Sequence, residues 1–147
     1  MKNIPSVDLS DFLSNDSQKK EKFIKEIGEA YEEIGFVALK GHFLSDELCE
    51  NLYSEVKSFF DLPEEVKESY EIDGIGGQRG YTSFGKESAK GKSEGDLKEF
   101  WHFGQEVVNN DQLKAEYPNN VEVSELSNFN KIGMETYQML EKTAIYV

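Results

Sequence analysis

The chain has 147 residues, 37% of them hydrophobic and 12% aromatic, which is typical of one globular domain rather than of a disordered protein. Its 29 acidic residues outnumber its 16 basic residues, and this excess disfavours contact with nucleic acid phosphates, although solubility alone also explains it. A single cysteine excludes an internal disulfide. With no long apolar segment and no signal peptide, we expect a cytoplasmic protein that binds no membrane.

The first part of the chain predicts a strand, a helix and a second strand. Residues 4–12 alternate apolar and polar side chains, which favours a short strand. The next segment predicts a helix that ends at Gly35, because apolar residues recur there at helical spacing. These residues are Phe23, Ile27, Ala30, Tyr31 and Ile34. Residues 36–40 predict a buried strand that Gly41 closes.

The middle of the chain predicts two more helices and then a glycine-rich loop. Ser45 or Asp46 can cap a helix, and Pro63 begins a shorter one. The apolar stripe of the first of these helices is Leu48, Leu52, Val56, Phe59 and Phe60. Residues 71–96 hold seven of the twelve glycines, which indicates a loop or a loosely held hairpin.

The last part of the chain predicts one strand and one long helix. Residues 99–104 carry large side chains on both faces, so we expect a strand that is covered on both sides. A helix is predicted from about Leu126 and is expected to continue through Val147, because no glycine, proline or capping residue ends it. That pattern predicts a chain cut from a longer protein.

Residue chemistry alone gives no complete catalytic set. The glycines of residues 73–80 miss the dinucleotide-binding spacing, because Arg79 stands where the third glycine belongs, so a flexible loop is the better interpretation. His102 and Glu106 lie four residues apart, but on a strand this spacing separates them by about 13 Å. With two histidines and one cysteine, the chain offers few metal ligands.

Several spaced motifs nevertheless resemble the N-terminal half of one enzyme family. They are the opening IPSVDLS, the segment EIGFVALKGHFLSDELCENLYSEVKSFFDLPEEVKESY, and the pair QRGYTSFGKE and DLKEFWHFG. Together they resemble the isopenicillin N synthase-like family of non-haem Fe(II)/2-oxoglutarate-dependent dioxygenases. The resemblance covers residues 4–107.

The resemblance implies an α+β fold in which N-terminal helices and strands flank an incomplete double-stranded β-helix (jelly-roll) core. It implies that residues 1–107 are the dioxygenase N-terminal region and that residues 108–147 are a linker and a helix leading to an iron-binding domain. In the family, a His-x-Asp...His triad holds Fe(II) and an Arg-x-Ser motif holds 2-oxoglutarate. This chain contains neither motif. We therefore expect it to bind neither cofactor alone and to lack activity alone.

The resemblance also nominates residues that contact a small-molecule substrate. Tyr81 and Thr82 lie at the family's Gly-Tyr step, and Arg79 is a candidate for binding a substrate carboxylate, with an exposed loop arginine as the alternative. On the later strand, we expect His102 to face the substrate and Trp101 to face the packed side.

Two functions remain open from the sequence. The first is an oxygenase fragment that supplies scaffold and part of the substrate pocket. The second is a catalytically inactive, stand-alone acidic binding module of the same fold. A fragment would expose apolar surface, so we also expect marginal stability or self-association.

Overall fold

The computed structural model describes residues 3–87, 95–107, 113 and 116–147. The chain divides into two compact units. One unit consists of residues 1–45 together with residues 138–147, and the other consists of residues 46–137.

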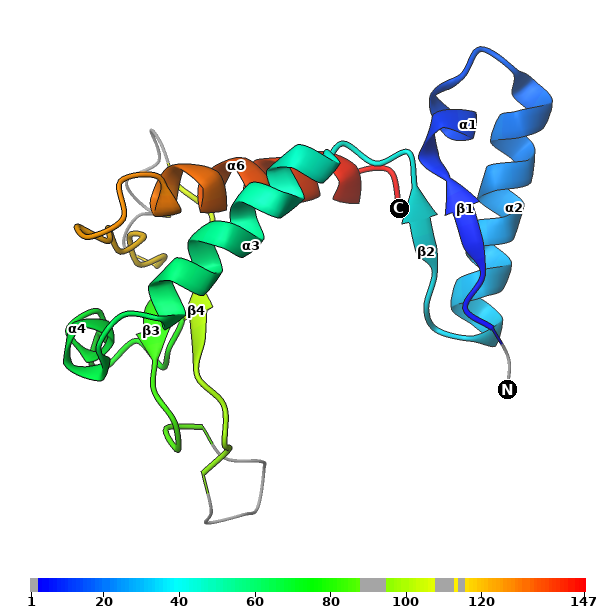
Figure 1. Cartoon of the computed structure of the whole chain (residues 1–147). Coiled ribbons are helices and arrows are strands. Elements are labelled where there is room, and N and C mark those ends of the chain that lie inside the picture. The colour runs from blue at the N-terminus through cyan, green and yellow to red at the C-terminus, as the bar shows by residue number, and fades with distance from the viewer. Residues whose placement is uncertain (1–2, 88–94, 108–112, 114–115) are drawn as a thin grey trace. The chain divides into compact units, whose positions relative to one another are not determined.

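The first unit is built on a two-stranded parallel sheet. Strand β1 (Ser6–Asp8) pairs with β2 (Ala38–Lys40), and the helices α1 (Leu9–Leu13) and α2 (Ser17–Glu33) follow β1 (Figure 1). Its buried core consists of Val7, Leu9 and Phe23.

The expected strand over residues 4–12 is correct only for residues 6–8. Helix α1 replaces the expected strand over residues 9–12, because the Asp8 side chain accepts a hydrogen bond from the backbone N–H of Ser10 and caps a helix there. The alternation that predicted a strand also places Leu9 and Phe12 three residues apart, on one side of a helix turn.

Helix α2 confirms the expected stop at Gly35. Asp16 caps its first turn by accepting hydrogen bonds from the N–H groups of Gln18 and Lys19. The N–H groups of Ile34 and Gly35 both donate to the carbonyl of Ala30, and Gly35 has a φ of 81°. This left-handed residue ends the helix at low steric cost because glycine has no Cβ.

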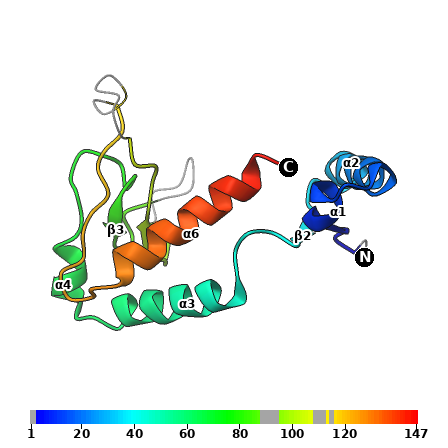
Figure 2. The ribbon, with the colours of Figure 1, turned by 90° about the horizontal axis from the view of Figure 1, so that it is seen from above.

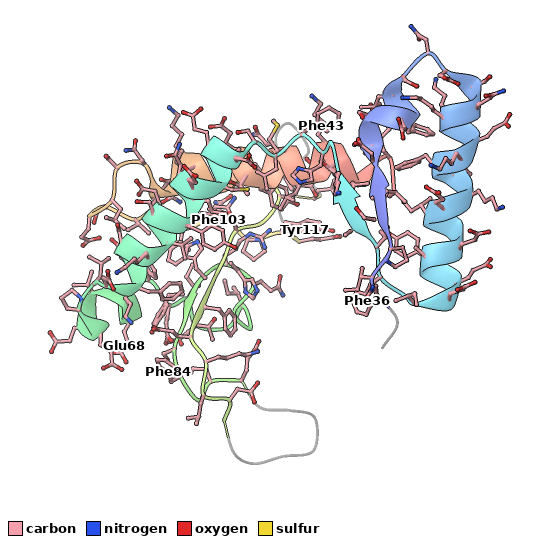
Figure 3. The ribbon with its side chains drawn as sticks, turned by 45° about the vertical axis from the view of Figure 1, so that its right-hand side comes forward. Phe36, Phe43, Glu68, Phe84, Phe103 and Tyr117 are labelled. Atoms are coloured by element: carbon pink, nitrogen blue, oxygen red, sulfur yellow. The ribbon has the colours of Figure 1, made fainter. Side chains whose placement is uncertain are left out.

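The expected buried strand over residues 36–40 is only partly correct. Strand β2 covers Ala38–Lys40, and its two outer residues are exposed. The side chain of Phe36 is 68% exposed and extends away from the ribbon (Figure 3). In the described part of the chain β2 pairs with β1, and the strand has no second neighbour there to cover Phe36.

Helix α6 (Phe129–Ala144) is the predicted third long helix, but it ends before the last residue. Tyr146 and Val147 turn back on Thr143 and Ala144 through backbone hydrogen bonds. The ring of Tyr146 lies 6.0 Å from that of Phe12. The expectation of a helix through Val147 is therefore wrong, because aromatic packing draws the last residues out of the helix.

The second unit places a two-stranded antiparallel sheet against helices. Its elements are α3 (Asp46–Phe60), α4 (Glu64–Glu68), β3 (Gly80–Thr82), β4 (Phe100–His102) and the first part of α6. The end of α3 meets the start of α6, where the rings of Phe59 and Phe129 stack with centroids 5.0 Å apart (Figure 2). The buried core consists of Phe59, Tyr81, Val123 and Phe129.

The fold is thus mixed α and β with two small sheets. The predicted boundary between residues 107 and 108 lies at the edge of a segment outside the described residues. Among the helices that the structure describes, none has the length and apolar content needed to cross a membrane.

Candidate functional site

The β3–β4 sheet has one packed face and one polar face. Tyr81 pairs with Trp101, so both side chains lie on the same face, and the Trp101 ring packs 4.7 Å from that of Phe59. This confirms that Trp101 faces the packed side. Thr82 pairs with Phe100, and Gly80 pairs with His102, on the opposite face.

The polar face of the sheet is open in the described residues, whereas the sequence predicted that other elements cover it. His102 is exposed and Phe100 is half-buried. The expectation that this strand is covered on both sides is therefore wrong for the described residues, in which helices pack on the Trp101 face.

Tyr81 is held at the packed face by a buried charge pair. Its side chain is 2% exposed, and its hydroxyl donates to the carboxylate of Glu99, which also accepts a hydrogen bond from Lys67 Nζ at 2.6 Å. Burial and the neighbouring Glu99 carboxylate raise the pKa of Tyr81, so the phenol stays protonated. Burial alone would raise the pKa of Glu99, but the hydrogen bonds from Lys67 and Tyr81 outweigh it and lower that pKa.

Thr82 is a buried polar residue whose hydroxyl has no hydrogen-bond partner among the described residues. It is 6% exposed, and a Cβ on Gly77 would lie 2.8 Å from its Oγ1. Because Gly77 has a φ of 70° and carries no side chain, the loop of residues 73–80, here called the glycine loop, can lie against this hydroxyl.

His102 is fixed to the same loop in one tautomer. Its Nδ1 lies 2.6 Å from the carbonyl oxygen of Gly77. A carbonyl can only accept, so Nδ1 carries the proton and donates it to this bond. In the neutral ring Nε2 is then a hydrogen-bond acceptor, and His102 as a whole is exposed.

Arg79 is buried rather than exposed. Its side chain is 8% exposed, its Nη1 donates to the carbonyl of Gln78 at 2.6 Å, and its Nε has no partner among the described residues. The guanidinium lies against Gly104, where a Cβ would come 1.8 Å from Cζ. The alternative of an exposed loop arginine is therefore wrong, and a buried cation of this kind favours an anionic partner.

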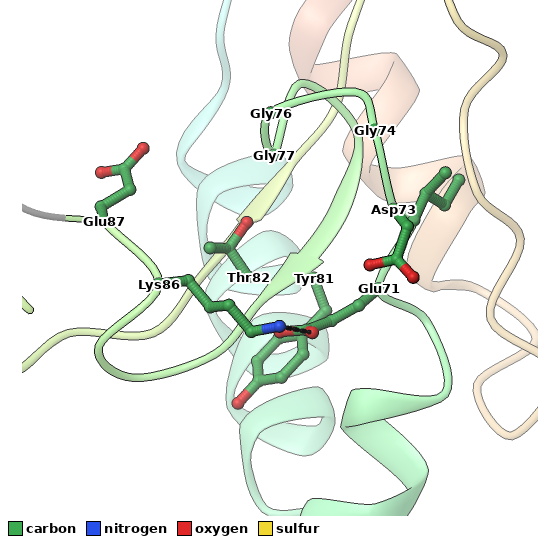
Figure 4. Close-up of a pocket in the computed structure, with 10 residues that line it drawn as sticks. Glu71, Asp73, Gly74, Gly76, Gly77, Tyr81, Thr82, Lys86 and Glu87 are labelled. Atoms are coloured by element: carbon green, nitrogen blue, oxygen red, sulfur yellow. Dashed lines mark ion pairs between the residues drawn. The ribbon is translucent and has the colours of Figure 1, made fainter.

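A cavity of about 250 Å³ lies between the glycine loop and β3 (Figure 4). Tyr81 and Thr82 line it, whereas Arg79 and His102 do not. His102 is linked to its wall through Gly77, which also lines the cavity. The structure thus brings three of the four nominated residues around one loop and places Arg79 beside Gly104.

The residues that the structure describes contain no group of three His, Cys, Asp or Glu side chains that could hold a metal ion. His42 and His102 belong to different units.

Some residues that shape the site could not be identified from the sequence. Lys67 stands in the polar stretch EEVKE, which is typical of an exposed helix, yet it is 7% exposed. Asn120 accepts from the N–H of Gly104 and donates to its carbonyl, both at 2.8 Å, and so fixes the backbone on which Arg79 lies. Neither the burial of Lys67 nor the contact of Asn120 with Gly104 can be predicted from the local sequence, because both depend on residues far apart in the chain.

Known proteins resemble this chain along most of its length. The family model described as "non-haem dioxygenase in morphine synthesis N-terminal" matches residues 4–124. The 2-oxoglutarate-dependent dioxygenase imqE of Aspergillus flavus is 38% identical over 86 residues, which are 58% of this chain and 24% of that protein.

Solved structures agree with this match. A 2OG-Fe(II) oxygenase family protein from Caulobacter crescentus superimposes with a TM-score of 0.81 at 31% identity, over 98% of this chain and 46% of that one. A Neurospora crassa protein, solved in complex with alpha-KG and thymine, shares the fold with a TM-score of 0.71 at 23% identity, over 95% of this chain and 44% of that one. This chain spans less than half the length of each of these relatives. It belongs to the family of non-haem, 2-oxoglutarate-dependent dioxygenases and corresponds to their N-terminal region.

Proposed function

We propose that the chain forms the N-terminal part of an Fe(II)/2-oxoglutarate-dependent oxygenase that acts on a small molecule. It supplies scaffold and part of the substrate pocket. Strands β3 and β4 belong to one end of a jelly-roll core whose other strands lie outside these residues. Residues 1–107 form the N-terminal region, and residues 108–147 lead to the domain that binds iron.

The observation that carries the proposal is the family match over residues 4–124, together with the polar face of β3–β4. That face presents a buried hydroxyl on Thr82 and an oriented imidazole on His102, neither of which is needed to fill the core. Polar groups of this kind give a mostly apolar pocket its specificity.

We assign distinct contributions to the four residues nominated from the sequence. Thr82 and His102 contact the substrate from the polar face. Tyr81, held by Glu99, lines the floor of the cavity. Arg79 binds a substrate carboxylate, because a guanidinium recognises a carboxylate through paired N–H donors and no carboxylate of the described residues pairs with it.

Fe(II) and 2-oxoglutarate are the cofactors that the relatives' names imply for the complete enzyme. Three protein ligands and open coordination positions suit Fe(II) for oxygen activation. The described residues do not form such a set, so the ligands must come from other residues. The role of this chain is then to bind and orient the substrate.

Turnover by the product of the complete reading frame tests the proposal. We expect that protein to consume 2-oxoglutarate when Fe(II) and oxygen are present, and to stop when a chelator removes the metal. Consumption is measured by succinate formation. If the complete product forms no succinate with Fe(II) while remaining folded, the oxygenase assignment is wrong.

A further inference from the structure

His102 presents its imidazole on the polar face of the β3–β4 sheet. The residue is exposed, and its cross-strand partner Gly80 has no side chain to lie beside the ring. Phe100, two residues earlier on the same strand, packs edge-on against the imidazole, with ring centroids 4.8 Å apart. His102 is therefore an oriented polar side chain that a ligand can reach, in contrast to the buried Thr82.

The proton of the neutral imidazole is placed by the glycine loop. Nδ1 lies 2.6 Å from the carbonyl oxygen of Gly77, and the proton on Nδ1 makes this bond. Because a neutral imidazole carries one N–H, Nε2 keeps its lone pair and can only accept. The structure shows no bond from a described residue to Nε2. An unconstrained histidine in water prefers the opposite tautomer, so the loop fixes a form that His102 would not favour by itself.

The position of the Gly77 carbonyl depends on the contact between the glycine loop and β3. A Cβ on Gly77 would lie 2.8 Å from Oγ1 of Thr82, so only glycine allows the loop to lie this close. Figure 4 shows the Thr82 side chain directed toward the loop. The preceding residue, Gly76, also has a positive φ, of 59°, but a Cβ there would meet no atom within 4 Å. Of these two neighbours, Gly77 is therefore the one whose missing side chain brings the loop against β3 and its carbonyl within reach of His102.

We propose that Gly77 is a positioning residue that fixes His102 as a hydrogen-bond acceptor for the substrate. The oxygenase then selects a molecule that presents an O–H or N–H donor to β4. It disfavours a molecule of similar shape that presents an ether or carbonyl oxygen there, because two acceptors that face each other both lose hydrogen bonds to water. This assignment deepens the proposed function and rests on it, since it takes His102 as a substrate contact.

The tautomer of His102 in the 147-residue chain tests the role of Gly77. Long-range ¹H–¹⁵N NMR distinguishes the two ring nitrogens at alkaline pH, where an imidazole is neutral. We expect the form with the proton on Nδ1 to predominate. Gly77→Ala should lower the ratio of this form to the other by about two- to tenfold, the effect of losing one hydrogen bond. Gly76→Ala is the matched control, because it introduces a similar backbone strain without the clash with Thr82, and it should leave the ratio unchanged.

Phenol and anisole test whether the acceptor selects a donor, because the two probes have similar shapes and only phenol carries an O–H group. We expect phenol to shift the Nε2 signal of His102 in a saturable manner and anisole to leave it in place. His102→Asn keeps an N–H donor for Gly77 but places no acceptor at the position of Nε2. It should weaken phenol binding, followed at the amide signal of Gly80, by about two- to tenfold. His42→Asn is the control, because His42 belongs to the other unit, and it should leave phenol binding unchanged.

Three results would overturn the inference. The first is a wild-type chain in which the proton of His102 lies mainly on Nε2. The second is a tautomer ratio that is the same in Gly77→Ala as in the wild type. The third is a phenol shift that is absent or equal to that of anisole. None of these measurements involves iron or succinate formation by the complete enzyme, so failure here is distinguishable from failure of the proposed function.

Discussion

Replacing Phe59 with alanine should lower the free energy of unfolding by about 3–5 kcal/mol, the usual cost of deleting a buried phenylalanine ring. Phe59 is fully buried at 0% exposure. Its ring packs against five other aromatic rings, those of Phe60, Tyr70, Tyr81, Trp101 and Phe129. It therefore joins α3 to both β3–β4 and α6, and its loss leaves a cavity where these elements meet.

Urea unfolding followed by far-UV circular dichroism measures this loss. Fluorescence is the less suitable signal, because the Trp101 ring packs on Phe59 and its emission responds to the substitution itself. Tyr53→Ala is the control on the same helix, since Tyr53 is 76% exposed. It should change the unfolding free energy by no more than about 0.5 kcal/mol. A loss below about 1 kcal/mol for Phe59→Ala would show that the aromatic cluster does not hold this unit together.

Replacing Lys67 with methionine should cost about 3 kcal/mol, the lower end of the range for breaking a buried ion pair. The Lys67 and Glu99 side chains are only 9% and 19% exposed. The substitution leaves the Glu99 carboxylate with Tyr81 as its hydrogen-bond donor among the described residues. Lys57→Met is the control, because its pair with Asp61 is at the surface and contributes about 0–1 kcal/mol.

The cost of Lys67→Met should also depend on pH. Because the folded state holds the pKa of Glu99 below its ordinary value of 4.5, the pair stabilises the fold above that pH and loses its effect as the pH falls through the lowered pKa. The stability difference between wild type and Lys67→Met should therefore narrow below pH 4.5. A difference that stays constant from neutral pH into this range would contradict the assigned role of Glu99.

The sequence predicts best the parts of the fold that depend on local periodicity. The prediction of helix α2 and of its end at Gly35 was correct, because helical spacing and a left-handed glycine are local properties. Its predicted apolar stripe was only partly correct, since Phe23 and Ala30 are buried but Tyr31 is 48% exposed. The prediction of a strand over residues 9–12 was wrong, because one capping side chain, that of Asp8, outweighs an alternating pattern. The prediction that α6 continues through Val147 was wrong, because Tyr146 contacts residues far earlier in the chain, Phe12 and Phe43.

Candidate site residues could be nominated from the sequence, but their surroundings could not be predicted. The motifs nominated residues 79–82 and His102, and strand parity correctly placed Trp101 on the packed side. Burial of Arg79 was missed, because it depends on the absent side chain of Gly104, which lies much later in the sequence. The Glu99–Lys67 pair was missed for the same reason, since a long-range ion pair leaves no periodic signal.

We propose that this chain supplies the substrate wall and not the iron centre. Titration of the 147-residue chain with Mn(II), a redox-stable substitute for Fe(II), followed by electron paramagnetic resonance with 2-oxoglutarate present, tests it most directly. We predict no stoichiometric metal binding and no succinate formation when Fe(II) replaces Mn(II). One tightly bound metal ion per chain, accompanied by succinate formation, would contradict the claim.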